Sequence, residues 1–180
     1  IAGQEKPELN QLRMCVPFGV GTALAGCAPL ETVQAGDLER YAGKWYEIAK
    51  QPNFFQQQCF GGTTAEYTLL TDGTVRVENR CRVGSLDGEE KVIGGSARVV
   101  EPSTNAKLAV GFGAAGFFEG PYWILALDPD YQWAVVGDPS RLTLWILART
   151  PQLDDATYEM IVSMLPDLGY DPAQLVKTPQ

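Results

Sequence analysis

Apolar and polar residues alternate along most of the chain between residues 44 and 149, and this period of two is typical of β-strands with one buried face. Residues 74–83 show it most clearly, because the odd positions are mostly apolar while the even positions from 76 to 82 are charged. The odd-numbered face must therefore point into the core. That face also carries Asn79, whose amide needs a hydrogen-bond partner from the protein or from a ligand.

The same period, interrupted by Gly, Asp, Asn and Pro, divides this region into eight short strands. Asp72-Gly73 is a strong hairpin signal, and Gly94-Gly95 allows the bend or bulge that closure of a barrel requires. The predicted fold is all-β, an eight-stranded antiparallel up-and-down β-barrel whose interior holds side chains or one small ligand. We expect its strands at residues 44–50, 63–70, 74–83, 91–100, 106–112, 122–127, 132–136 and 142–149.

Short helical segments flank the predicted strands. Residues 37–43 read as one helical turn capped by Asp37, which would plug the base of the barrel. Residues 154–168 have apolar side chains at helical spacing, so we expect one C-terminal α-helix packed on the outer wall. Residues 171–176 could add a last turn and a short strand. We expect residues 28–180 to form a single domain.

The two ends of the strand series predict how one end of the barrel is sealed. Gly43-x-Trp45 opens the first strand and Arg149 ends the last. The Trp45 indole can cover the base of the core while the Arg149 guanidinium lies over its face and bonds nearby carbonyls. A barrel sealed in this way has a hollow interior, where we expect the function to lie.

Two apolar loops lie beside the predicted cavity. Residues 51–62 include Phe54 and Phe55, which suggest a lid or an edge that touches a membrane. The alternative, which we favour, is that both rings fold inward as a hydrophobic cover. Residues 113–120 form the second loop, which is flexible and apolar.

Composition and charge exclude several function classes. The 180-residue chain has a formal net charge of −8, which argues against binding nucleic acid or an anionic lipid surface through a basic patch. It has no histidine, so Ser-His-Asp and Cys-His catalysis and histidine-bound metals are excluded. The four cysteines lack the Cys-x-x-Cys spacing of zinc and redox sites. We predict no catalytic residue, no metal and no cofactor.

Three short motifs resemble those of the lipocalin family, and in particular its bacterial outer-membrane lipoproteins. The first is residues 43–49 (GKWYEIA), the second is residues 122–131 with an altered Asp128-Pro129-Asp130-Tyr131, and the third is residues 144–151 (LWILARTP). They occur in order, at the right separations, with a helix after the last. The resemblance covers about residues 37–178.

The resemblance implies a cavity that binds a small hydrophobic molecule. In the bacterial branch the implied ligand is a fatty acid or lysophospholipid, stored or transported in the cell envelope, and a conjugated pigment or retinoid-like ligand is an alternative. Family pockets carry over to Tyr67, Asn79, Tyr122 and Trp145. Simple core filling is an equal alternative for Trp145.

Two further function classes stay open beside binding. A lipocalin-fold enzyme would need a titratable group inside the barrel, and the strands interpreted as inward-facing show Asn, Tyr, Trp and aliphatic residues but no Asp or Glu. We therefore predict that the protein is not an enzyme. A structural envelope protein with a filled barrel is the third class, and a homodimer is possible in each.

Cys59 and Cys81 fall near the open end of the predicted barrel, a pair that the bacterial branch does not lead us to expect. For an extracytoplasmic protein a disulfide is the natural interpretation, worth about 3 kcal/mol, and would pin the mouth loop. Two free thiols are the alternative.

Residues 1–27 predict a targeting segment. An apolar run from Met14 ends in Leu24-Ala25-Gly26-Cys27, which resembles the lipobox of bacterial lipoproteins, where the cysteine receives lipid. This implies membrane attachment through Cys27, on the outer membrane facing the periplasm. The alternative is an apolar arm packed on the domain, and whether Cys15 is present in the mature protein stays open.

Overall fold

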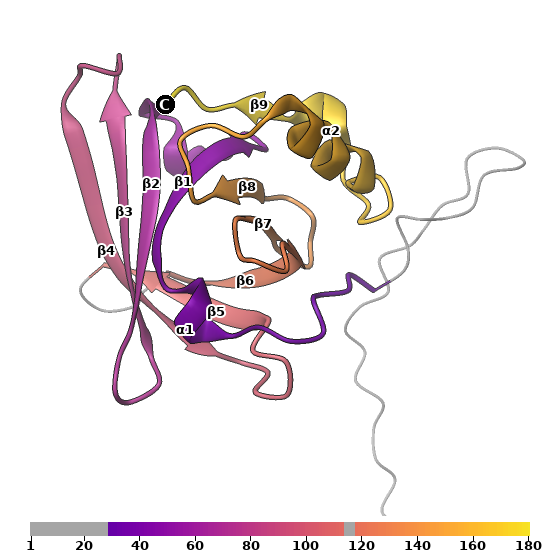
Figure 1. Ribbon diagram of the computed structural model, residues 1–180. Coiled ribbons are helices and arrows are strands. Elements are labelled where there is room, and N and C mark those ends of the chain that lie inside the picture. The colour runs from indigo at the N-terminus through magenta and orange to yellow at the C-terminus, as the bar shows by residue number, and fades with distance from the viewer. Residues whose placement is uncertain (1–28, 114–117) are drawn as a thin grey trace, which may run out of the picture.

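Nine antiparallel strands form one continuous sheet in the computed structural model, which describes residues 29–113 and 118–180 (Figure 1). The strands are β1 (Gly43–Lys50), β2 (Cys59–Leu69), β3 (Val75–Val83), β4 (Glu90–Val99), β5 (Lys107–Phe112), β6 (Phe118–Leu127), β7 (Trp133–Gly137), β8 (Leu144–Ala148) and β9 (Val176–Lys177). The helices are α1 (Leu38–Tyr41), η2 (Phe54–Gln56), α2 (Asp155–Met164) and η3 (Pro172–Gln174).

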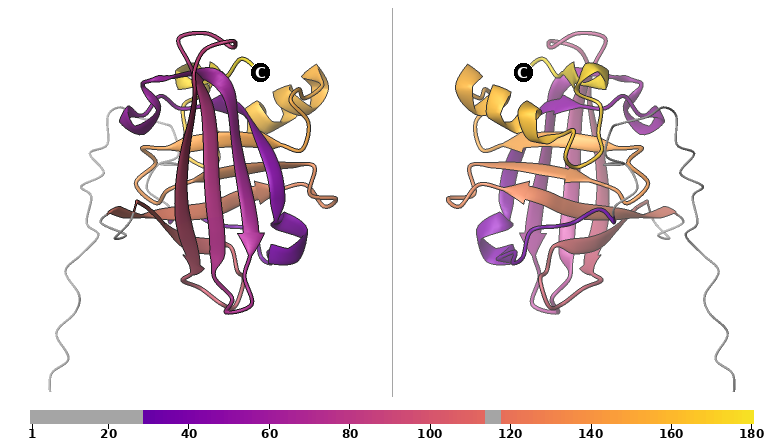
Figure 2. Two further views of the ribbon diagram at one scale, coloured as in Figure 1. Left: turned by 90° about the vertical axis from the view of Figure 1, so that its left-hand side faces the viewer. Right: turned by 90° about the vertical axis from the view of Figure 1, so that its right-hand side faces the viewer.

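The sheet closes into a barrel because β1 pairs on both sides. From β2 to β7 each strand pairs with the next one in sequence. Strand β8 then pairs with β1, and β1 also pairs with β2. Tyr46 marks the closure, since it lies opposite Thr64 of β2 and Ala148 of β8. Figure 2 shows the wall of β2, β3 and β4 crossing that of β5 to β8. The predicted eight-stranded up-and-down barrel is confirmed, and β9 is added outside it along β1.

Several strand boundaries and bulges differ from the prediction. Strand β2 begins at Cys59, four residues early, because Cys59 already pairs with Val83 of β3. Gly94-Gly95 forms no bulge, since β4 pairs there with β3 and, from Gly95 on, with β5 without a register shift. The shifts lie instead in β1, β2 and β6. Gly95 serves close approach, because an added Cβ would lie 2.3 Å from the carbonyl oxygen of Gly111 on β5.

Two apolar clusters hold the fold, one inside the barrel and one outside. The alternation predicted for β3 is confirmed, because Val75, Val77 and Cys81 are at most 6% exposed. The even-numbered face is external and carries ion pairs of Arg80 with Glu78 and Glu90. The outer cluster packs Ile161 of α2 and Leu165 against β8, as Figure 1 shows for the helix and strand, so the expected position of the helix is also correct.

Helix α2 is shorter than predicted. Asp154 caps it, accepting a hydrogen bond of 2.9 Å from the Thr157 backbone N–H. It ends at Met164 rather than at residue 168. Pro166 follows, and because proline has no backbone N–H the helical ladder cannot continue. No helix in residues 29–113 or 118–180 is long and apolar enough to span a membrane.

The turn between β7 and β8 is built on one buried carboxylate, Asp138, which is 6% exposed. It accepts hydrogen bonds of 2.7 Å from the backbone N–H groups of Ser140 and Thr143, and 3.1 Å from that of Leu142. Burial acts to raise the pKa of Asp138, but the hydrogen bonds from Ser140 and Thr143 together outweigh it, so the pKa lies below its ordinary value.

Candidate ligand site in the barrel interior

One end of the barrel is closed by α1 and a tryptophan–arginine stack. The Trp45 side chain is fully buried, and its Nε1 donates to the Tyr41 carbonyl at 2.8 Å. The Arg149 guanidinium lies 3.8 Å from the centre of the Trp45 ring. It donates to the carbonyls of Lys44 at 3.0 Å and Arg40 at 2.6 Å. These contacts tie the end of β8 to β1 and α1, so we refer to this end as the closed end.

Three tyrosines meet inside the barrel near the closed end. The Tyr122 hydroxyl lies 2.7 Å from that of Tyr41 and 3.0 Å from that of Tyr67. Burial raises the pKa of Tyr67 to about 12 and raises the pKa values of Tyr41 and Tyr122 well above the ordinary value. All three phenols are therefore neutral at physiological pH. The structure thus brings together two sequence-predicted pocket residues, Tyr67 and Tyr122, and adds Tyr41, which the sequence did not single out.

A small cavity of about 20 Å³ lies against this tyrosine cluster. Its volume is close to the minimum that one water molecule needs. The interior is therefore narrower here than the hollow expected from the sequence. The lining is apolar, formed by the rings of the three tyrosines together with Leu38, Ala42, Val75, Ala97, Leu108 and Val110.

The other two predicted pocket residues lie nearer the opposite end, which we call the mouth and which carries loops 51–58 and 84–89. Asn79 stands opposite Ala65 on the inward face of β3. Its Oδ1 atom is buried without a hydrogen-bond partner in the described part of the chain. Trp145 is part-buried and packs against the interior cluster. A ligand or water that donates a hydrogen bond would satisfy Asn79.

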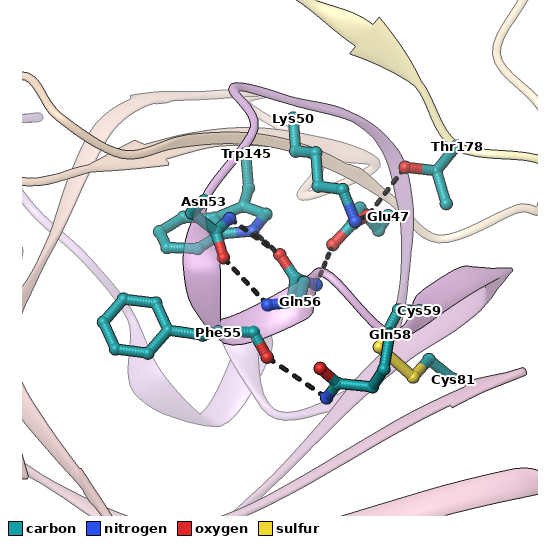
Figure 3. The surroundings of a disulfide bond; sticks show 10 residues. All are labelled: Glu47, Lys50, Asn53, Phe55, Gln56, Gln58, Cys59, Cys81, Trp145 and Thr178. Carbon is teal, nitrogen blue, oxygen red and sulfur yellow. Dashed lines mark hydrogen bonds and ion pairs between the residues drawn. A yellow bond between two sulfur atoms is a disulfide. The ribbon is translucent and has the colours of Figure 1, made fainter. Parts of the chain in front are cut away.

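A buried glutamate at the mouth corrects one prediction. Glu47 is 3% exposed and lies two residues after Trp45, so the prediction of inward strands without Asp or Glu is wrong. Its carboxylate accepts hydrogen bonds from Gln56 Nε2 and Thr178 Oγ1, each at 2.6 Å, and pairs with Lys50 Nζ at 3.2 Å (Figure 3). The period of two along β1 was the signal that could have revealed it.

Gln56 links this carboxylate to the predicted pocket. Its Oε1 accepts from Trp145 Nε1 at 2.9 Å and from Asn53 Nδ2 at 3.0 Å, while its Nε2 bonds Glu47 (Figure 3). Because Gln56 lies in a loop, no periodic pattern could have identified it. The contacts hold the loop between β1 and β2 over the mouth.

The aromatic residues of this loop face outward. Phe54 and Phe55 are 70% and 58% exposed, and their ring centroids lie 3.9 Å apart. The expectation that they fold inward is wrong, because Gln56 takes the inward position and Asn53 caps the turn before them. At the base of the loop Cys59 and Cys81 form a disulfide, as expected, with their Cα atoms 5.5 Å apart.

The remaining sequence predictions fall partly outside the described residues. Cys15, Cys27 and the lipobox-like segment lie outside them. Within the described ranges no group of three or more Cys, Asp or Glu side chains could hold a metal ion.

The motifs and the barrel geometry agree with the comparison to known proteins. The family model of the lipocalin-like domain matches residues 36–180. The chain belongs to the lipocalin family. The lipocalin is 44% identical over 157 residues to temperature-induced lipocalin-1 of Arabidopsis thaliana, covering 84% of this chain and 83% of the relative. It is 34% identical over 145 residues to the outer membrane lipoprotein Blc of Vibrio cholerae, covering 80% and 82%.

Solved structures support the fold of this lipocalin. Insecticyanin from the tobacco hornworm, Manduca sexta, superposes with a TM-score of 0.67 at 22% identity, covering 86% of each chain. At that identity the likeness concerns the fold alone. The sequence relatives of this lipocalin include a plant protein and a bacterial outer membrane lipoprotein.

Proposed function

We propose that this lipocalin binds a small hydrophobic ligand inside the barrel and carries it rather than reacts with it. The observation that supports this most directly is the partial exposure of Asn79 and Trp145, which lie on the inward face of an otherwise well-packed barrel. Side chains of this kind are accessible where the interior opens at the mouth. Each ligand methylene buried against them contributes about 0.8 kcal/mol, so about ten carbons give micromolar affinity after ordering costs.

We propose a fatty acid or lysophospholipid as the ligand class, stored or transported in a bacterial envelope. The apolar side chains of Val75, Val110 and Leu108 suit an acyl chain in polarity, and the cavity of about 20 Å³ between them must widen to admit one. A charged headgroup is best solvated at the mouth. Lys50 at the mouth is already paired with Glu47 and adds little attraction for an anion. The similarity to Blc supports localisation in the bacterial cell envelope, a lipid anchor at Cys27 and a non-catalytic role. Because one relative is a plant protein, the cellular localisation is the first point to test.

A conjugated pigment or retinoid-like molecule is the second candidate ligand. The aromatic residues Tyr41, Tyr67, Tyr122 and Trp145 line the same interior and could pack on the face of a flat molecule. An enzymatic role is less well supported, because the Glu47 carboxylate is engaged by Lys50, Gln56 and Thr178.

The exposed Phe54–Phe55 pair supports loading of the ligand at a lipid surface. Loop residues 51–58 carry no charge, and the two rings project beside the mouth. Aromatic side chains favour the interface between headgroups and acyl chains. With a net charge of −8, the protein suits an uncharged or zwitterionic lipid surface better than an anionic one.

Native mass spectrometry of protein purified without detergent tests the proposed function. We expect a co-purifying mass in the range of a single lipid. The Trp145→Ala variant should bind the same lipid about tenfold more weakly with an unchanged fold. Trp123→Ala is the matched control, because Trp123 packs on the outer wall and should leave binding unchanged. If no ligand is retained or bound on addition, or if Trp145→Ala binds normally, the proposed function or its pocket is wrong.

A further inference from the structure

The tyrosine cluster carries one hydroxyl proton that its own hydrogen bonds cannot use. Tyr41, Tyr67 and Tyr122 have three hydroxyl protons, and two hydrogen bonds join them through Tyr122. Each bond uses one proton. Whichever hydroxyl donates in each bond, one proton is left without an acceptor inside the cluster.

The described surroundings of the cluster provide no acceptor for this proton. The phenols are neutral, and the adjoining cavity of about 20 Å³ is lined by the tyrosine rings and by Leu, Val and Ala side chains, which offer the spare proton no acceptor. A buried donor without an acceptor is unfavourable, so the spare proton requires an oxygen from a water or a ligand. A carboxylate would be a poor occupant, because burying an anion beside neutral phenols costs far more than one hydrogen bond returns.

We propose that the tyrosine cluster is a specificity site that donates a hydrogen bond to an uncharged oxygen at the inner end of the ligand. The ligand class is an apolar chain or ring system that carries a ketone, ester, ether or hydroxyl oxygen at that end. Such a ligand enters with this oxygen first and leaves any charged group at the mouth. This proposal rests on the proposed function, since it requires an apolar ligand in the barrel.

The site is tested with matched probes and the full chain. The probes are 2-nonanone, its isostere 2-methyl-1-nonene, which lacks the oxygen, and decanoate, each competing with anilinonaphthalene sulfonate fluorescence. The test variant is Tyr41→Phe/Tyr67→Phe/Tyr122→Phe, which removes every hydroxyl proton of the cluster and keeps the rings. The affinity of each probe is compared between the wild type and the variants, so the free energy of removing that probe from water is the same in every comparison. Tyr158→Phe is the control, because it removes a phenol hydroxyl from the outer wall and leaves the cluster intact.

The triple variant should bind 2-nonanone roughly three- to tenfold more weakly, the loss expected for one hydrogen bond, and should bind the alkene and decanoate as the wild type does. Tyr158→Phe should keep the ketone affinity of the wild type. Unchanged ketone affinity in the triple variant overturns the specificity site, and water then satisfies the proton, while the proposed function stands. If none of the three probes binds to the wild type, the proposed function fails and the specificity site with it.

A second measurement needs no variant and covers the case in which the triple variant fails to fold. The carbonyl stretch of ¹³C-labelled 2-nonanone bound to the wild type should lie at lower wavenumber than in hexane, as for a hydrogen-bonded ketone. A bound ketone with an unshifted stretch overturns the proposal.

Discussion

The Cys59–Cys81 disulfide offers a prediction whose magnitude follows from the structure. The double variant Cys59→Ala/Cys81→Ala removes a cross-link that closes a loop of 22 residues. Loop-closure entropy for that length gives a loss of about 3 kcal/mol in the free energy of unfolding. At roughly 2–4 °C per kcal/mol for a chain of this size, the melting temperature should fall by about 6–12 °C.

The loss should act through the unfolded chain, because the bonded residues also lie in paired strands, with Cys59 opposite Val83. Strand pairing does not depend on the sulfur atoms, so the native barrel should persist. We therefore expect nearly unchanged circular dichroism in the folded state, together with a larger denaturant m-value, since an unlinked chain exposes more surface on unfolding.

Urea unfolding of the double variant, the wild type and the reduced wild type checks this reasoning. All chains carry Cys15→Ser and Cys27→Ser to prevent thiol exchange. Reduction should lower the stability of the wild type by about the same 3 kcal/mol and leave the double variant unchanged. A loss below about 1 kcal/mol would refute the entropic argument, as would an equal effect of reductant on the double variant.

Three further predictions concern the closed end, one turn and the loop tip. Arg149→Lys should lower the free energy of unfolding by about 2 kcal/mol, because an ammonium cannot bond several carbonyls while lying over Trp45, and thermal unfolding measures it. Asp138→Asn should destabilise the fold by about 1–3 kcal/mol at pH 7. Because the folded pKa of Asp138 is depressed, its contribution to the free energy of unfolding is present above the unfolded pKa of about 3.9 and is lost as the pH falls through the folded value. Between about pH 5 and 2 the free energy of unfolding should therefore fall less in Asp138→Asn than in the wild type. Phe54→Ser/Phe55→Ser should weaken co-sedimentation with phosphatidylcholine vesicles several-fold without changing stability, since both rings are exposed; unchanged sedimentation would count against loading at a lipid surface.

Much of the barrel could be predicted from local patterns. The alternation in residues 74–83 assigned the inward face of β3 correctly, including the position of Asn79. The failures have separate physical causes. The pattern at Gly94-Gly95 signals a small residue but not whether it serves a bend or a close approach to the next strand. The outward orientation of Phe54 depends on which neighbouring side chain occupies the space beneath the loop.

The sequence by itself determined which residues of β3 face the interior, because the period of two is local to the backbone. It placed Tyr67 and Tyr122 in one chamber but could not join them, since their contact spans 55 residues of chain. The hydrogen bonds of Tyr122 with Tyr41 and of Trp145 with Gln56 span 81 and 89 residues. Barrel closure and register alone decide such pairs, because a shift of two residues keeps every face and changes every partner.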